Sequence, residues 1–275
     1  MNFLEKLEIK AEWATKRHNR MLSKPNEDRI FIDEKNRIFI LLDGVTRVHK
    51  EYEEAPDTSS AGDIGDLFIE EVCKHLKENA ENAEPEALLR EAVRKANSRI
   101  KEYREKKSEN EWEYYPATLG IVSVLKGNTL HYVSCGDCAA VLLRKNAKII
   151  MGYEWTLDAH DVIDVSKKER YARYCNHPEN DLSYTIYNGD DAVVDGIEYS
   201  FVDLHSGDTL VIVSDGMGDY VRYEKIKTLL EYSPEEMIAL SSKYDEPPFG
   251  EYADDKSVIK ISLSIPNKTE TELEK

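Results

Sequence analysis

The stretch LVIVSDGMGDY, from Leu210 to Tyr220, sets a run of apolar, mostly β-branched residues directly before an aspartate and a glycine. The same order recurs in IFILLDGV, from Ile38 to Val45. Continuous apolar runs of this length are typical of strands that are buried on both faces. One Asp-Gly pair at a strand end has an ordinary explanation, because both residues favour turns. Its repetition suggests instead that rigid strands deliver carboxylates to a common place.

Further acidic residues stand beside other predicted strands. Asp254 and Asp255 precede the apolar run SVIKI, and Glu27 and Asp28 precede RIFID. If these strands are neighbours, their carboxylates gather at one edge, where they repel one another and raise one another's pKa values. A bound hard cation removes that cost, and magnesium, manganese and calcium prefer oxygen ligands. A glycine after Asp43 would also let the backbone carbonyl approach an ion closely.

Histidine usage supports a carboxylate site over a zinc site. The seven histidines are scattered, and none shows the two-histidine helical spacing of a zinc hydrolase. Two hard ions roughly 3.5 to 4 Å apart can hold a hydroxide between them and neutralise the charge of a phosphate. The residues therefore indicate phosphoester hydrolysis.

Charge and hydropathy exclude several classes of partner. The chain has 275 residues and a formal net charge of −17, which repels nucleic acid and anionic membranes. No apolar stretch approaches the roughly 20 residues of a membrane helix, and the N-terminus MNFLEKLEIK lacks the features of a signal peptide. We expect a cytoplasmic protein, a monomer, without nucleic-acid or membrane partners.

The four cysteines are Cys73, Cys135, Cys138 and Cys175. Cys135 and Cys138 form a Cys-x-x-Cys, which suggests a redox pair or half a zinc site, but no second such pair exists. The intervening Gly136-Asp137 instead predicts a tight hairpin turn. We expect two reduced thiols that flank this turn.

The predicted elements follow the order strands, two helices, strands, a polar insertion, strands, a helix and a strand. The predicted strands cover residues 7–13, 29–33, 37–44, 117–125, 129–134, 139–144, 199–204, 209–214 and 257–265. Helices are predicted over 64–76, from Pro85 to about 103, after the capping box that begins at Ser166, and after Ser233-Pro234. Short turns predict a hairpin over 29–44 and a three-stranded meander over 117–144. Clustered strands joined in this way indicate antiparallel sheets in one layered α+β domain.

Six short motifs follow one another along the chain. They are Asn26-Glu27-Asp28, Asp43-Gly44, Ala117-Thr118-Leu119, Gly136-Asp137, Ser214-Asp215-Gly216 with Asp219, and Asp254-Asp255-Lys256-Ser257-Val258-Ile259. In order and rough spacing they resemble the PPM family of metal-dependent serine/threonine protein phosphatases, protein phosphatase type 2C. The likeness runs from about residue 7 to residue 263.

The resemblance implies a four-layer α/β/β/α sandwich, with two central antiparallel sheets flanked by helices and a two-metal centre at one end. It implies one phosphatase domain over residues 1–265, a flap at about 153–190, and a charged, disordered tail over 266–275. Two divalent cations, Mn²⁺ or Mg²⁺, are implied as cofactors, with a weaker third ion. A phosphorylated protein is the implied substrate and partner.

The resemblance also implies roles for individual residues. Asp43 corresponds to the carboxylate that bridges both ions, and Asp215 and Asp254 to further ligands of the first ion. The carbonyl of Gly44, and Glu27 through water, would serve the second ion. The remaining roles are those of Asp28, which would orient metal-bound water, and Asp137, which would help to hold the third ion.

The chain departs from the family pattern where the substrate phosphate is held. Many members carry an arginine five residues before the position of Asp28, and this chain has Ser23 there. Arg20, Lys24 and Arg47 are the candidate replacements, although a lysine or a displaced arginine does not guarantee bidentate geometry. The residue after Gly44 is a valine, so a histidine general acid at that point is excluded.

The leading hypothesis is hydrolysis of phosphoserine and phosphothreonine in proteins by a hydroxide that bridges two divalent ions. One alternative is a regulatory or binding module of the same fold with little turnover. The retained Asp43, Asp215 and Asp254 argue against it, because mutually repelling acids have little reason to assemble without ions. The other alternative is a two-metal phosphatase that acts on a small-molecule phosphoester.

Overall fold

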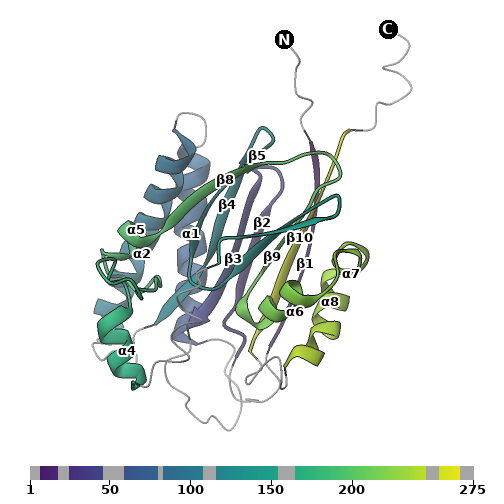
Figure 1. The fold of residues 1–275 in the computed structure, drawn as a ribbon. Coiled ribbons are helices and arrows are strands. Elements are labelled where there is room, and N and C mark those ends of the chain that lie inside the picture. Colours follow the sequence, from purple (N-terminus) through teal and green to yellow (C-terminus); the bar gives the residue numbers. More distant parts are fainter. Residues whose placement is uncertain are drawn as a thin grey trace, which may run out of the picture.

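The structure is a computed structural model that describes residues 7–17, 25–45, 59–79, 83–107, 116–153, 165–245 and 254–266. The strands in this part of the chain form two five-stranded sheets in which all paired neighbours are antiparallel (Figure 1). The first sheet has the order β1 (Glu8–Lys16), β10 (Lys256–Ser264), β9 (Thr209–Val213), β6 (Ala139–Arg144) and β7 (Ala147–Met151). The second has the order β2 (Arg29–Asp33), β3 (Ile38–Val45), β4 (Ala117–Lys126), β5 (Thr129–Cys135) and β8 (Glu198–Asp203).

Helices cover the outer faces of both sheets. On the second sheet lie α1 (Ser60–Asn79) and α2 (Pro85–Lys107), with α1 against β3 and β4 and α2 against β5. On the first sheet lie α6 (Gly218–Tyr223), α7 (Ile226–Glu231) and α8 (Pro234–Ser241), the last against β1 and β10. The predicted four-layer α/β/β/α sandwich is confirmed (Figure 1).

Both faces of β9 are covered, which explains its continuous apolar run. Leu210 and Ile212 belong to the core cluster that contains side chains of both sheets and of α1 and α2. Val211 and Val213 point the other way and pack with side chains of α6 to α8. All four are fully buried, and each such side chain contributes about 1.5 to 3 kcal/mol by leaving water. A charged side chain at any of the four positions would be buried among apolar side chains without a partner for its charge.

Local capping chemistry begins two of the helices where the sequence predicted. The side chain of Ser233 accepts a hydrogen bond from the backbone N–H of Glu236, whose carboxylate accepts one from the Ser233 N–H. Pro234 occupies the first turn of α8, where its missing N–H costs nothing. Helix α4 (Lys167–Tyr174) likewise begins at Ser166, which accepts from the N–H of Glu169.

The predicted three-stranded meander over 117–144 is wrong at its third strand. β4 and β5 form a hairpin, but β6 pairs with β7 and β9 in the other sheet. Gly136-Asp137 is therefore the crossing between sheets and not a hairpin turn. The two residues favour any tight bend, and the partner of the next strand depends on distant residues. Cys135 and Cys138 are buried, reduced thiols on either side of this crossing.

Several shorter elements were not indicated by the sequence, and one apolar side chain lies in an unexpected place. The strand β7 and the helices α5 (Val193–Gly196), α6 and α7 were not predicted. Two short 3-10 helices, η2 (Asp215–Met217) and η3 (Ser242–Tyr244), were also not predicted. The strand predicted over 7–13 is confirmed as β1, but Trp13 is 52% exposed and lines an open groove with Phe31 and Lys77. Trp13 alternates along β1 in step with Leu7, Ile9 and Ala11, which pack in or against the core, but β1 is an edge strand of its sheet.

The segment between β7 and β8 is attached to the rest of the molecule by buried amides. Tyr187 exchanges two backbone hydrogen bonds with Thr118 at the start of β4. Asn188 is fully buried, and Asn97 of α2 accepts a hydrogen bond from the adjacent Gly189 N–H and donates one to the Asp190 carbonyl. These contacts fix the end of this segment beside β4 and α2.

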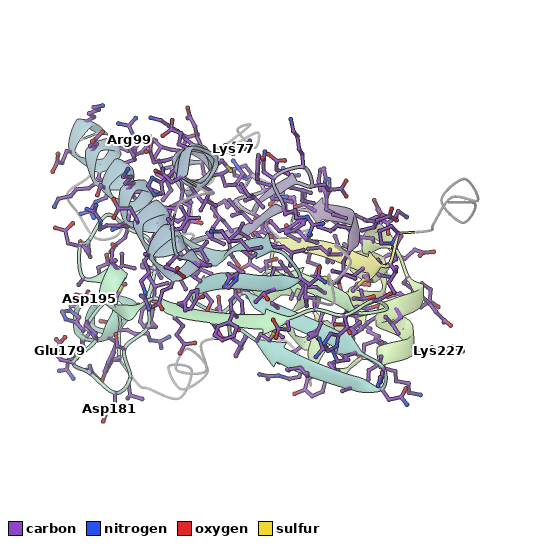
Figure 2. All side chains as sticks on the ribbon, turned by 90° about the horizontal axis from the view of Figure 1, so that it is seen from above. Lys77, Arg99, Glu179, Asp181, Asp195 and Lys227 are labelled. Atoms are coloured by element: carbon purple, nitrogen blue, oxygen red, sulfur yellow. The ribbon has the colours of Figure 1, made fainter. Side chains whose placement is uncertain are left out.

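The periphery of the molecule is charged, as the composition requires. Arg99, Glu179, Asp181 and Lys227 all project from the outer surface (Figure 2). In the described part of the chain, no helix is long and apolar enough to cross a membrane.

Candidate metal centre

Antiparallel pairing brings the acidic strand ends to one end of the sandwich. The carboxyl end of β3 carries Asp43, Asp137 follows β5, and Asp215 follows β9 after one serine. The amino ends of β2 and β10 lie beside the carboxyl ends of β3 and β9, and they are preceded by Asp28 and Asp254. Residues more than 200 positions apart therefore meet because their strands run in opposite directions.

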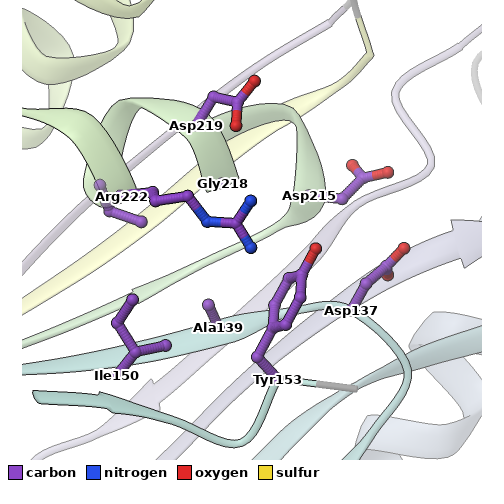
Figure 3. Close-up of a pocket in the computed structure, with 9 residues that line it drawn as sticks. Asp137, Ala139, Ile150, Tyr153, Asp215, Gly218, Asp219 and Arg222 are labelled. Carbon is purple, nitrogen blue, oxygen red and sulfur yellow. The ribbon is translucent and has the colours of Figure 1, made fainter. Parts of the chain in front are cut away.

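Three of these carboxylates form a compact cluster. Oxygen atoms of Asp43, Asp137 and Asp215 all lie within 4.8 Å of one another. Asp43 is the most deeply placed, Asp137 is half-buried and Asp215 is exposed at the rim. Figure 3 shows Asp137 and Asp215 side by side at the edge of a cavity. The cluster is therefore anchored in the protein interior and open to solvent on one side.

Burial and mutual repulsion perturb the acids at this end of the sandwich. Desolvation raises the pKa of Asp43 well above its ordinary value of 3.8, and the nearby carboxylates of Asp215, Asp28, Asp254 and Asp137 raise it further. In the metal-free chain, the charged form of Asp43 is therefore disfavoured. A cation among these oxygens would reverse each of the repulsive contributions.

Asp28 lies behind the cluster in a buried polar network. Its Oδ2 atom accepts a hydrogen bond of 2.8 Å from the Ser214 hydroxyl, which in turn accepts one of 3.0 Å from the Ser257 N–H. Burial raises the pKa of Asp28, and the neighbouring Asp255 carboxylate raises it further, while the hydrogen bonds from Ser257 and Ser214 oppose the shift. The network holds the loop before β2 against the ends of β9 and β10.

Two glycines of the acidic motifs are required by close backbone approach. A Cβ atom on Gly44 would lie 2.5 Å from the Cβ atom and 2.8 Å from the carbonyl oxygen of Glu27. A Cβ atom on Gly216 would lie 2.2 Å from the carbonyl oxygen of Asp255. Each Asp-Gly pair thus combines an acidic side chain with room for the neighbouring loop that carries another acid.

The position of Asp43 is further held by β4 and by the segment between β7 and β8. The hydroxyl of Thr118 donates a 2.7 Å hydrogen bond to the backbone carbonyl of Asp43. The N–H and carbonyl of Thr118 pair with those of Tyr187. Thr118 thus connects the strand that carries Asp43 to the base of the segment predicted to be a flap.

The donor set fits hard divalent cations. Carboxylate oxygens are the ligands that magnesium and manganese prefer, and three of them converge within the span of one or two ions. The Oδ1 atom of Asp28 is buried and has no hydrogen-bond partner among the described residues, so it can accept a hydrogen bond from an ordered water molecule. The residues present therefore suit a cation site with bound water.

Not every residue predicted for the site lies in the compact cluster. Asp254 and Asp28 are near enough to Asp43 to raise its pKa, and Gly44 follows Asp43 directly. The side chain of Glu27 accepts a short hydrogen bond from the Ser59 hydroxyl and is buried.

The three basic residues predicted to contact substrate are not placed by the structure. Arg20, Lys24 and Arg47 lie outside the described residues.

Several residues with clear structural roles were not assigned any by the sequence. Asp255 is 2% exposed and accepts a 2.8 Å hydrogen bond from the Glu27 N–H. Thr118 binds the backbone carbonyl of Asp43, and Ser214 and Ser257 hydrogen-bond to the side chain of Asp28. Each of them adjoins or belongs to one of the acidic motifs, so proximity to these motifs was the available signal.

Comparison with known proteins gave a family match over most of the chain. A family model described as protein phosphatase 2C matches residues 17–239. A comparison with curated proteins found no match.

Several solved structures share the fold at low sequence identity. The catalytic domain of the serine/threonine protein phosphatase PstP, solved with two manganese ions, is 20% identical, with 94% of this chain and 99% of that chain covered and a TM-score of 0.67. The Mycobacterium tuberculosis phosphatase PstP/Ppp is 21% identical over the same shares, with a TM-score of 0.66. The Mycobacterium smegmatis phosphatase MsPP, in complex with cacodylate, is 14% identical, with 93% and 98% covered and a TM-score of 0.61.

Proposed function

Because this chain belongs to the protein phosphatase 2C family of serine/threonine protein phosphatases, we propose that it hydrolyses phosphoserine and phosphothreonine monoesters in proteins with two divalent cations. Manganese and magnesium are the proposed ions, since the donors are carboxylate and carbonyl oxygens. The neighbour PstP was solved with two manganese ions, which supports the same cofactor here.

The observation that carries the proposal is the convergence of Asp43, Asp137 and Asp215 within 4.8 Å. In the proposed centre, Asp43, Asp215 and Asp254 would hold the first ion. Asp43, the carbonyl of Gly44 and, through water, Glu27 would hold the second.

Asp137 is the proposed ligand of a weaker third ion. Its oxygen lies within the same 4.8 Å as those of Asp43 and Asp215, which supports a place for it among the cation ligands.

When bound, the cations would supply a water nucleophile of lowered pKa and neutralise charge on the phosphoryl group. The chain's own residues would prepare the site for this. Asp43 lies on β3, and Asp137 and Asp215 lie within two residues of the ends of β5 and β9, so little reorganisation is needed when charge develops. The buried Oδ1 atom of Asp28 is placed to accept a hydrogen bond from water and so orient it.

The segment over 153–190 is proposed as the flap beside this centre. Its end pairs with Thr118, whose hydroxyl binds the carbonyl of Asp43, so the flap base and the cluster share one strand. A substrate that contacts the flap would therefore lie close to the cation ligands.

Metal-dependent turnover tests the proposal directly. The assay measures hydrolysis of an aryl phosphate and of a phosphothreonine peptide with manganese, magnesium or a chelator. We expect both substrates to be cleaved only with metal. If neither substrate is cleaved, the protein is a regulatory module. If only the aryl phosphate is cleaved, the protein is a small-molecule phosphatase.

A variant identifies the ligands within that assay. Asp215→Asn should reduce turnover by several orders of magnitude and leave the fold intact, because Asp215 is exposed at the rim and its loss opens no cavity in the core. Asp195→Asn is the matched control, since Asp195 is an exposed acid of α5 on the outer surface and lies outside the proposed flap (Figure 2). Retention of most activity by Asp215→Asn would remove this residue from the ligand set.

A further inference from the structure

A cavity of about 220 Å³ opens directly beside the acidic cluster. Asp137 and Asp215 line both the cavity and the cluster, and Tyr153, Asp219 and Arg222 complete its polar lining (Figure 3). This volume is far larger than the roughly 15 Å³ that one water molecule requires. A ligand in the cavity would therefore lie against the same carboxylates that are proposed to hold the cations.

Arg222 and Tyr153 face each other across this cavity. The guanidinium carbon of Arg222 lies 5.4 Å from the centre of the Tyr153 ring, which is a cation–π contact. Figure 3 shows the Arg222 side chain extending from α6 toward Tyr153 and the two cluster carboxylates. A guanidinium carries five N–H donors in one plane, and a phosphate can accept hydrogen bonds from two of them at once.

The backbones that carry these two side chains are attached to the same strand. Lys148 of β7 donates hydrogen bonds of 2.8, 2.7 and 3.0 Å to the carbonyls of Val221, Arg222 and Glu224 at the end of α6. Tyr153 follows β7 by two residues. The contact between Arg222 and Tyr153 is therefore preorganised, and binding a ligand would require little additional ordering.

The charges around the cavity select the class of ligand. Asp137, Asp215 and Asp219 supply negative charge, and Arg222 is the cation among the described residues that line the cavity. Once cations occupy the cluster, the cavity lies between two sources of positive charge. A tetrahedral phosphoryl group has enough oxygen atoms to contact both at once, whereas a carboxylate has two.

We propose that Arg222, braced by Tyr153, binds the phosphoryl oxygens of the substrate and holds the phosphorus toward the acidic cluster. This assignment rests on the proposed phosphatase function and adds a substrate-binding residue that comes from α6. Arg222 would position the phosphate through in-plane hydrogen bonds, and Tyr153 would act through Arg222 by fixing its orientation.

Direct binding of inorganic phosphate to the manganese-loaded protein tests the assignment without depending on turnover. We expect Arg222→Ala to weaken phosphate binding, measured by calorimetry, by tenfold or more, which is about the contribution of one charge-assisted contact. Arg222→Lys should recover part of the loss, because it keeps the charge but not the paired donors. Lys227→Ala is the control, since it removes one positive charge from an exposed site on α7.

Variants at the ring test the bracing. Tyr153→Leu should weaken phosphate binding by about two- to fivefold, the size of an exposed cation–π contact, and Tyr153→Phe should leave it unchanged. Manganese titration and thermal unfolding of every variant should match the wild type, which separates loss of a phosphate contact from loss of the fold or the cations.

The kinetic outcomes discriminate between the possible failures. If Arg222 contacts the phosphate, Arg222→Ala should raise KM by the same factor for an aryl phosphate and for a phosphothreonine peptide. Unchanged phosphate binding in Arg222→Ala, or a rise in KM for the peptide alone, would overturn the assignment and leave the phosphatase function standing. Wild-type protein that binds phosphate through Arg222 but shows no metal-dependent turnover would overturn the function and retain the assignment. Wild-type protein that binds no phosphate would overturn the assignment.

Discussion

Asp43→Asn should stabilise the metal-free protein and destabilise it, relative to the wild type, when manganese is present. In the absence of cations, Asp43 is buried and lies within 4.8 Å of the carboxylates of Asp137 and Asp215. Asparagine has nearly the same shape and no charge, so it removes the repulsion without opening a cavity. With manganese, the same substitution removes a central ligand and the stabilisation that binding provides.

The magnitude follows from the distance. Two unit charges 4.8 Å apart repel by about 3 kcal/mol at an effective dielectric constant of about 20. Asp215 is exposed, so solvent and salt screen its part of the repulsion. We expect the free energy of unfolding of metal-free Asp43→Asn near pH 8 to exceed that of the wild type by about 1 to 2 kcal/mol. In a chain of this size, that corresponds to a rise in Tm of a few degrees. Saturating manganese at about 100 times its Kd should stabilise the wild type alone by about 2.7 kcal/mol.

The pH dependence has a definite sign. Burial raises the pKa of Asp43 above 3.8 in the folded chain, so the folded state binds the proton more tightly than the unfolded state. This tighter proton binding by Asp43 contributes fully to the stability of the metal-free protein below pH 3.8. The contribution is lost as the pH rises through the higher pKa that Asp43 has in the folded chain. The difference between Asp43→Asn and the wild type should therefore be small near pH 4 and increase toward pH 8.

The assay is thermal or denaturant unfolding at several pH values, with a chelator and with manganese. Asp181→Asn serves as the control, because it removes one exposed acid on the outer surface (Figure 2). The reasoning would be refuted if, in chelator at pH 8, Asp43→Asn unfolded at the same temperature as the wild type or at a lower one. An equal gain in Asp181→Asn would show that net charge, and not the cluster, is responsible.

Gly216→Ala should lower the free energy of unfolding by about 1 to 3 kcal/mol, because the new Cβ atom would lie 2.2 Å from the Asp255 carbonyl and force the loops apart. Gly218→Ala, where nothing lies within 4 Å of the added atom, is the control for denaturant unfolding, and equal stability of the two variants would contradict the close approach. Thr118→Val removes the 2.7 Å hydrogen bond to the Asp43 carbonyl and should weaken manganese binding about tenfold in a calorimetric titration. Unchanged manganese affinity would show that the carbonyl of Asp43 needs no such support.

The sequence by itself determined the elements whose signals are local. The runs at Ile38–Leu42 and Leu210–Val213 are apolar at every position because each strand is covered on both faces, and this pattern can be recognised in one short segment. The capping box at Ser233 begins α8 for an equally local reason. The acidic motifs, through their resemblance to a known family, also predicted Asp43, Asp137 and Asp215 as members of one site, and oxygen atoms of the three lie within 4.8 Å of one another.

The tertiary structure alone decided how distant segments contact one another. β6 pairs with β7 and β9 in the other sheet and not with β5. The turn that precedes β6 does not specify these partners, so the sequence did not reveal them. The hydrogen bonds of Glu27 with Asp255 and Ser59 and the cation–π contact of Arg222 with Tyr153 each join residues that are far apart in the chain. Such contacts depend on the packing of whole layers, which periodicity and motif spacing do not encode.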